Sequence, residues 1–144
     1  MAGNDERYVP SDPELRSILW EARTVAVVGL SSNPNRESLS IANYLQDKGY
    51  RIIPVNPNET EVLGERAYPT LLDVPDKIDV VDVFRKPEAT PEIARQAVQI
   101  GAKVLWLQTD IVNDEARRVA ENAGLDVVMG VCIRSTHRRI SEVA

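Results

Sequence analysis

The stretch from residue 24 to residue 40 reads TVAVVGLSSNPNRESLS and decides the fold that we expect for this chain. An apolar, β-branched run comes first, Gly29 follows, and a hydroxyl-rich loop then leads into an amphipathic segment. This order is typical of a buried strand, a tight turn and a helix whose positive N-terminal end points back at the turn. The stretch therefore predicts an anion-binding turn after the first strand.

Length and composition favour a single domain. The chain has 144 residues, of which 43% are hydrophobic and 27% charged, enough for one core but not for two ordinary domains. No run approaches the roughly 20 apolar residues that span a bilayer, and the first residues lack the basic end and apolar run of a secretory signal. A single cysteine, Cys132, allows no internal disulfide. We therefore expect a cytoplasmic protein without a membrane segment.

The charge balance argues against two classes of partner. The formal net charge is -5 and the pI is near 4.9, whereas proteins that bind nucleic acids or anionic membranes usually carry a broad basic face. Aromatic residues make up only 5% of the chain, which leaves little material for stacking bases. A small polyanion stays compatible because a few local donors suffice to bind it. The sequence indicates neither a protein partner nor an oligomeric state.

From residue 24 onward, apolar runs alternate with segments of helical spacing. Strands are predicted at residues 24–28, 51–55, 78–84, 103–108 and 126–129. Capping residues, first-turn prolines and terminal glycines predict helices at about 11–23, 39–48, 90–101 and 113–124. Residues 1–10 are expected to be frayed, and residues 134–144 to form a polar, basic tail.

This alternation predicts an α/β fold, namely a single Rossmann-like, doubly wound sandwich with a five-stranded parallel sheet over residues 1–144. We favour the strand order 3-2-1-4-5, which places the topological switch between the first and fourth strands. The other doubly wound order stays open because hydrophobic periodicity does not decide between the two.

Ligands of such sheets bind beyond the carboxyl ends of the strands, here residues 29–36, 56–58, 84–86 and 108–110. These segments carry hydroxyl groups, amides and basic side chains with little acid. Serine hydroxyls can donate to phosphate oxygens, and an arginine can form paired charge-assisted bonds with them. The set suits a pyrophosphate. Its phosphate-facing members would include Gly29, Ser31, Ser32, Arg36 and Ser38, with Arg85 and Lys86 as further basic candidates.

A nicotinamide dinucleotide fits the sequence poorly. The fingerprint G-x-G-x-x-G would need glycines where Ser31 and Pro34 stand, so only Gly29 matches. An acid that would hold the adenosine ribose is expected just after the second strand, but Asn56 follows Val55. Both absences argue against a classical dehydrogenase.

An ordered succession of short motifs resembles the small stand-alone CoA-binding proteins, whose domain is similar to the nucleotide-binding domain of the succinyl-CoA synthetase α subunit. The resemblance runs from about residue 24 to residue 133. The motifs are VGLS (28–31) with Arg36 and Ser38, GY (49–50), IPVNP (53–57), LG (63–64), YPTL (68–71), DVFR (82–85), GAK (101–103) and LWLQ (105–108).

The resemblance implies a Rossmann-like domain that binds coenzyme A in an extended groove. By this similarity the hydroxyls after the first strand and Arg36 would face the phosphates. Asn56 and Pro57 would flank the adenosine part, and Phe84, Arg85 and Gln108 would line the remainder.

The chain shows no convincing catalytic or metal-binding constellation. Cys132 and His137 lie five residues apart with no assigned orienting carboxylate, and no cluster of cysteine and histidine has metal-ligand spacing. The leading hypothesis is therefore a non-catalytic protein that binds coenzyme A or an acyl-CoA as a carrier, sensor or regulatory module. Three alternatives stay open: a nicotinamide-dependent enzyme, a CoA-thioester enzyme that uses Cys132, and a subunit with a vestigial groove. A mixed disulfide between pantetheine and Cys132 is a further possibility.

Overall fold

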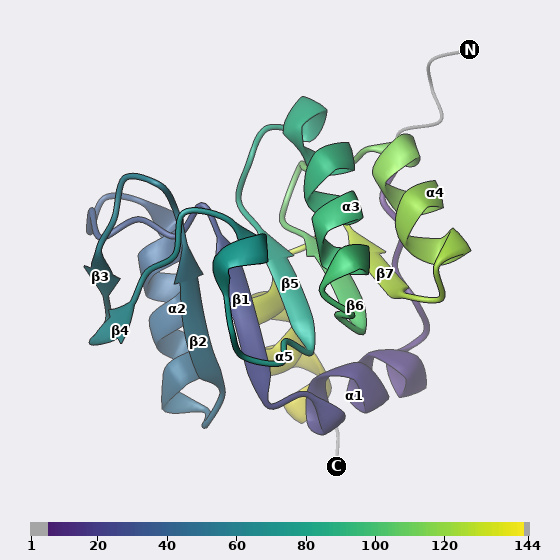
Figure 1. Ribbon diagram of the computed structural model, residues 1–144. Helices are drawn as coiled ribbons and strands as arrows, with labels where there is room; N and C mark the ends of the chain where they lie inside the picture. The colour runs from purple at the N-terminus through teal and green to yellow at the C-terminus, as the bar shows by residue number, and fades with distance from the viewer. Residues whose placement is uncertain (1–5, 143–144) are drawn as a thin grey trace.

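A computed structural model describes residues 6–142. The fold is a five-stranded parallel sheet with helices on both faces (Figure 1). The helices are α1 (Asp12–Glu21), α2 (Glu37–Asp47), α3 (Thr90–Gln99), α4 (Asp114–Asn122) and α5 (Ile133–Ser141), with short 3-10 helices η2 (Leu71–Asp73) and η3 (Pro87–Ala89). The main strands are β1 (Thr24–Val28), β2 (Arg51–Val55), β5 (Val80–Val83), β6 (Val104–Leu107) and β7 (Asp126–Met129). A small antiparallel pair consists of β3 (Glu61–Val62) and β4 (Glu65–Arg66).

The strand order of the sheet is β2-β1-β5-β6-β7, with all neighbours parallel. In chain order this is 2-1-3-4-5, so the α/β class and the five parallel strands are confirmed and the predicted order 3-2-1-4-5 is wrong. The topological switch lies between β1 and β5, where the third strand of the sheet pairs with the first. Consequently the loops after β1 and β5 lie side by side at the carboxyl ends of the strands.

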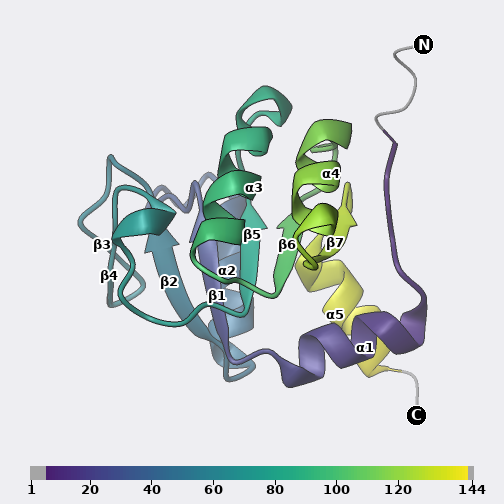
Figure 2. The same cartoon turned by 45° about the vertical axis from the view of Figure 1, so that its right-hand side comes forward.

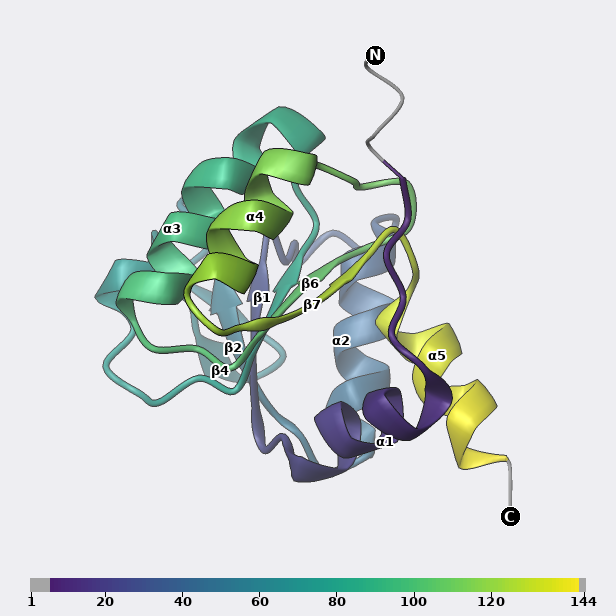
Figure 3. The same cartoon turned by 90° about the vertical axis from the view of Figure 1, so that its right-hand side faces the viewer.

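The helices form two layers around the sheet. Figure 3 shows α3 and α4 on one side and α2 and α5 on the other. Alternate strand residues belong to two hydrophobic cores, one on each face of the sheet. Val25, Val27 and Trp106 pack toward α1, α2 and α5, whereas Val81 and Leu105 pack toward α3 and α4. Because both faces are covered, the strands are apolar almost throughout, as expected for a parallel sheet.

The N-terminal segment is hydrogen-bonded to β7, an edge strand of the sheet. Tyr8 exchanges backbone hydrogen bonds with Met129 at 3.0 and 2.8 Å, and Ser11 then starts α1 with a capping box to Glu14. The expectation that the chain is frayed as far as residue 10 is therefore wrong from Tyr8 onward, and residues 1–5 lie outside the described range. Figure 2 shows this segment descending beside β7 to α1.

The expected basic tail is largely a helix, α5. Ile133, Thr136, His137 and Ile140 are buried, and their i, i+3, i+4, i+7 spacing forms one buried stripe on an otherwise basic segment. The segment expected as a polar, basic tail is therefore helical as far as Ser141, with one side buried. Residues 143–144 lie outside the described range.

Among residues 6–142, no helix has the length and apolarity needed to cross a bilayer.

Candidate functional site

An open cleft of about 630 Å³ lies at the carboxyl edge of the sheet, beside the topological switch. The loop after β1, the turn after β2 and the residues that follow β5 contribute to it, and all three come together at the upper end of the sheet in Figure 1. The lining residues are Gly29, Ser31, Asn33, Arg36, Glu37, Ser38, Asn56, Pro57, Asn58, Glu59, Phe84, Arg85 and Ile111.

Gly29 lines the cleft, and its backbone requires glycine. Its φ is +90°, and a Cβ built on it would lie 2.6 Å from the carbonyl oxygen of Phe84. The Gly29 N–H donates to the carbonyl oxygen of Val55 at 2.8 Å, and the Phe84 N–H donates to that of Val28 at 2.8 Å. The three strand ends therefore meet closely, and the missing side chain lets the Phe84 backbone and the Arg85 side chain approach the end of β1.

The loop between β1 and α2 is held by its own polar groups. The buried hydroxyl of Ser38 accepts a hydrogen bond from the Ser31 N–H at 3.1 Å, and the Ser31 hydroxyl accepts one from the Asn33 N–H at 3.0 Å. Arg36 occupies the N-cap position of α2 but makes no side-chain cap, and its side chain is exposed. The start of α2 thus presents a guanidinium group together with the positive helix end.

The Glu59 carboxylate accepts hydrogen bonds from both donors of Ser32, the backbone N–H and the side-chain hydroxyl. Its Oε2 accepts hydrogen bonds from the Ser32 N–H at 2.8 Å and from the Ser32 hydroxyl at 3.0 Å. A backbone N–H and a hydroxyl aimed at one carboxylate oxygen can equally bind a phosphate oxygen. An anionic ligand that uses Ser32 must therefore displace Glu59.

Asn56 joins the two loops that flank the cleft. Its side-chain amide donates to the carbonyl oxygen of Leu30 at 3.0 Å, and its Oδ1 accepts from the Asn58 N–H at 2.9 Å. Asn56 therefore fixes the turn after β2 against the loop after β1, with Pro57 beside it in the lining.

The structure brings together eight of the eleven predicted site residues in this cleft: Gly29, Ser31, Arg36, Ser38, Asn56, Pro57, Phe84 and Arg85.

The other three predicted site residues, Ser32, Lys86 and Gln108, do not line the cleft. Ser32 adjoins the lining through Glu59, and Lys86 is exposed at the start of η3. Gln108 is 3% exposed, and its Oε1 accepts a hydrogen bond from the Ile133 N–H at 3.1 Å. The side chain of Gln108 thus supports α5.

Sequence reasoning assigned no site role to Asn33, Glu37, Asn58, Glu59 or Ile111. Asn58 belongs to the polar turn after β2, so its position could have indicated it. Glu59 belongs to the same turn, and its N–H donates to the carbonyl oxygen of Asn56 at 3.2 Å. Ile111 carries no local signal because its place depends on how the loop after β6 folds over the strand ends.

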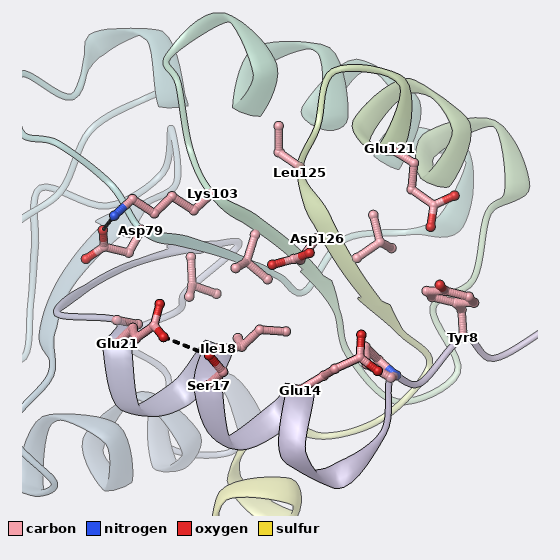
Figure 4. A pocket seen from close by; sticks show the side chains of 15 residues that line it. Tyr8, Glu14, Ser17, Ile18, Glu21, Asp79, Lys103, Glu121, Leu125 and Asp126 are labelled. Carbon is pink, nitrogen blue, oxygen red and sulfur yellow. Dashed lines mark hydrogen bonds and ion pairs between the residues drawn. The ribbon is translucent and has the colours of Figure 1, made fainter.

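A second cavity of about 260 Å³ lies at the opposite end of the sheet, where the strands begin (Figure 4). Carboxylates dominate its rim, including Glu14, Glu21, Glu121 and Asp126, and Lys103 pairs with Asp79 at 3.8 Å. Such a rim repels phosphate groups. The cleft beside the switch is therefore the better candidate for an anionic ligand.

Within residues 6–142, no group of three or more histidine, cysteine, aspartate or glutamate side chains is arranged to hold a metal ion.

A family model described as a CoA-binding domain matches residues 23–138 of this chain. The chain is 41% identical to the uncharacterized protein YneT of Bacillus subtilis over 128 residues, which cover 89% of this chain and 95% of YneT. A solved structure, a hypothetical protein from Pyrococcus horikoshii, shares 43% identity with a TM-score of 0.89, over 92% of this chain and 93% of that one.

A more distant relative is the ADP-forming acetate–CoA ligase II of Archaeoglobus fulgidus, at 28% identity over 123 residues. The match covers 84% of this chain but only 18% of the ligase.

Proposed function

The chain belongs to the CoA-binding domain family, and on that premise we propose that it binds coenzyme A in the cleft beside the β1–β5 switch without catalysing a reaction of its own. A carrier, a sensor and a regulatory module all fit this proposal. The ligase activity of the acetate–CoA ligase relative is not carried over, since the chain spans 18% of that enzyme.

The observation that carries the proposal is the donor set around Gly29. Gly29 lets the ends of β1 and β5 come together at the cleft, and Arg36 and Arg85 bring two exposed guanidinium groups to its lining. Pyrophosphate binding commonly uses open backbone, a helix N-terminus and bidentate arginines. We propose that the pyrophosphate lies over Gly29 and Ser31, with the adenosine toward Asn56 and Pro57.

Isothermal calorimetry on ligand-free protein tests the proposal with CoA, dephospho-CoA and NAD. We expect binding of CoA and weaker binding of NAD, because Asn56 replaces the acid that reads a free ribose diol. Absence of heat with CoA, or tighter binding of NAD, would refute the proposal.

The variant Arg36→Ala should weaken CoA binding about tenfold or more, the usual effect of losing a charge-assisted hydrogen bond. Arg95→Ala is the matched control. It removes another exposed arginine, which lies on α3 and pairs with Glu92 and Glu115 away from the cleft. Equal affinities for the two variants would exclude Arg36 from the site.

A further inference from the structure

Asp82 is a buried carboxyl group without a partner. It lies in the middle of β5, is fully buried, and neither of its oxygens has a hydrogen-bond partner among the described residues. Burial raises the pKa of Asp82 well above its usual value, and the neighbouring Cys132 thiol raises it further. This shift favours the protonated form of the carboxyl group, whose O–H has no acceptor among the described residues.

The side chain of Asp82 points toward the beginning of α5. Its strand neighbours Val81 and Val83 pack on the α3 and α4 side, so Asp82 faces the opposite layer. Trp106, its partner on β6, donates from Nε1 to the carbonyl oxygen of Val131 at 2.9 Å. Side chains from this part of the sheet therefore lie directly beneath the chain at Val131 and Cys132.

Cys132 is half-buried at the N-cap position of the nine-residue helix α5 and has a free thiol. It lines a hollow of about 360 Å³ together with Thr109, Gly130 and Arg139, at the carboxyl ends of β6 and β7. Thiol–disulfide exchange requires access to the sulfur, and the hollow provides it.

The hollow and the cleft both lie at the carboxyl ends of the strands. Val28, Val83, Leu107 and Met129 stand in register at the ends of four adjacent strands. Three strand spacings of about 4.8 Å separate the ends of β1 and β7 by roughly 14 Å. The pantetheine arm of CoA, about as long as four to five extended residues, spans roughly 15 Å. Phe84 lines the cleft and also packs on the same core as Cys132.

We propose that Cys132 is a thiol–disulfide exchange site for CoA disulfide, with one CoA unit held in the cleft. This inference rests on the proposed function. The Cys132 thiolate, its proton released to water, attacks one sulfur of the CoA disulfide. The sulfur–sulfur bond breaks, a Cys132–CoA disulfide forms, and the second CoA leaves as a thiolate that takes a proton. The exchange is neutral in electrons and needs no further oxidant.

Asp82 is a positioning residue in this proposal. Its protonated carboxyl group donates to the Cys132 thiolate, which supplies the acceptor that Asp82 otherwise lacks. Asp82→Asn keeps a neutral donor of similar shape and should keep the rate of exchange. Asp82→Leu removes the donor and should slow the exchange about tenfold or more, with unchanged affinity for reduced CoA.

The test uses the full chain, reduced and free of ligand, mixed with CoA disulfide or with glutathione disulfide and followed by intact-mass spectrometry. We expect one CoA adduct per chain, formed at least about tenfold faster than the glutathione adduct and reversed by dithiothreitol. Cys132→Ser should form no adduct and should bind reduced CoA, measured by calorimetry, as the parent does.

Each outcome is decisive. Binding of reduced CoA without an adduct, or equal rates with the two disulfides, overturns this inference and leaves the proposed function standing. Absence of CoA binding overturns both. Equal slowing by Asp82→Asn and Asp82→Leu would assign Asp82 a purely structural role. Circular dichroism of both variants identifies a loss of fold as the cause of slow exchange.

Discussion

Gly29 adopts a positive φ of +90° with the carbonyl oxygen of Phe84 close to the place of a side chain, whereas Gly101 has φ +76° with open space around it. Alanine at either position meets the cost of a left-handed backbone, about 1–2 kcal/mol. Only at Gly29 does a 2.6 Å contact with Phe84 add to it.

We therefore expect Gly29→Ala to lower the free energy of unfolding by about 1–3 kcal/mol more than Gly101→Ala does. Urea denaturation of both variants measures the difference. Equal losses would show that β1 and β5 separate easily at this edge, and that close approach of the two strand ends does not require glycine.

Glu59 is an acid in a cleft that we propose for an anion, and it already occupies the Ser32 N–H and hydroxyl. A neutral glutamine competes less well for these donors and does not repel a phosphate. We therefore expect Glu59→Gln to bind CoA about three- to tenfold more tightly in calorimetry, a gain of roughly 1 kcal/mol.

Glu37→Gln is the control for Glu59, because Glu37 also lines the cleft but starts α2 and is not bonded to Ser32. If both variants gain equally, general repulsion explains the effect. Weaker CoA binding by Glu59→Gln would instead mean that the carboxylate accepts a hydrogen bond from the ligand.

At the scale of elements, hydrophobic periodicity and caps predicted all five main strands and the first four helices. The strand order was predicted wrongly because periodicity reports which residues are buried and is silent on which strands are neighbours. Helix α5 was missed because only two of its four buried residues, Ile133 and Ile140, are apolar, so the segment reads as polar and basic in the sequence. Gln108 was placed in the ligand groove because it ends a strand, but its side chain turns inward to Ile133.

Helix α5 carries a pH-dependent contribution to stability through His137. The ring is buried against Trp20, Tyr44 and Tyr50, and its Nδ1 lies 2.8 Å from the Tyr44 hydroxyl. Burial, followed by the charge of Lys48, lowers the pKa of His137 below its ordinary 6.5. The unfolded chain thus takes up the proton first, so this contribution is present above pH 6.5 and is lost as the pH falls through the lowered pKa.

We expect the stability gap between the parent and His137→Phe to shift by up to about 1.4 kcal/mol per pH unit between pH 7.5 and 5.5, in favour of the variant at low pH. Urea denaturation at both pH values measures it. Comparing the two proteins cancels the contributions of Asp82 and the surface carboxylates, which both share. A constant gap would mean that His137 keeps its ordinary pKa in the folded state.

At the scale of the whole molecule, a chain with net charge -5 has the cleft that we propose for an anion at the carboxyl ends of its strands and a carboxylate-rimmed cavity at their beginnings. Charges farther apart than about 8 Å are largely screened at physiological salt. Arg36 and Arg85 in the cleft wall therefore decide local binding more than the net charge does.

Ligand binding at this edge should stabilise the whole fold, because the cleft exists only where the loops after β1, β2 and β5 meet. A ligand that binds only the folded state adds RT ln(1 + [L]/Kd), about 2.7 kcal/mol when CoA is present at 100 times its Kd. For a domain of this size we expect the melting temperature to rise by about 5–10 °C. Circular dichroism at increasing CoA concentration measures this rise.

The variant Arg36→Ala should melt at the parent temperature without ligand, since Arg36 is exposed and caps nothing with its side chain. With CoA, its melting curve should respond only at about tenfold higher concentration, because it binds the ligand more weakly. A lower melting temperature without CoA would mean that Arg36 supports the loop itself. An unchanged response to CoA would place the phosphates elsewhere on the molecule.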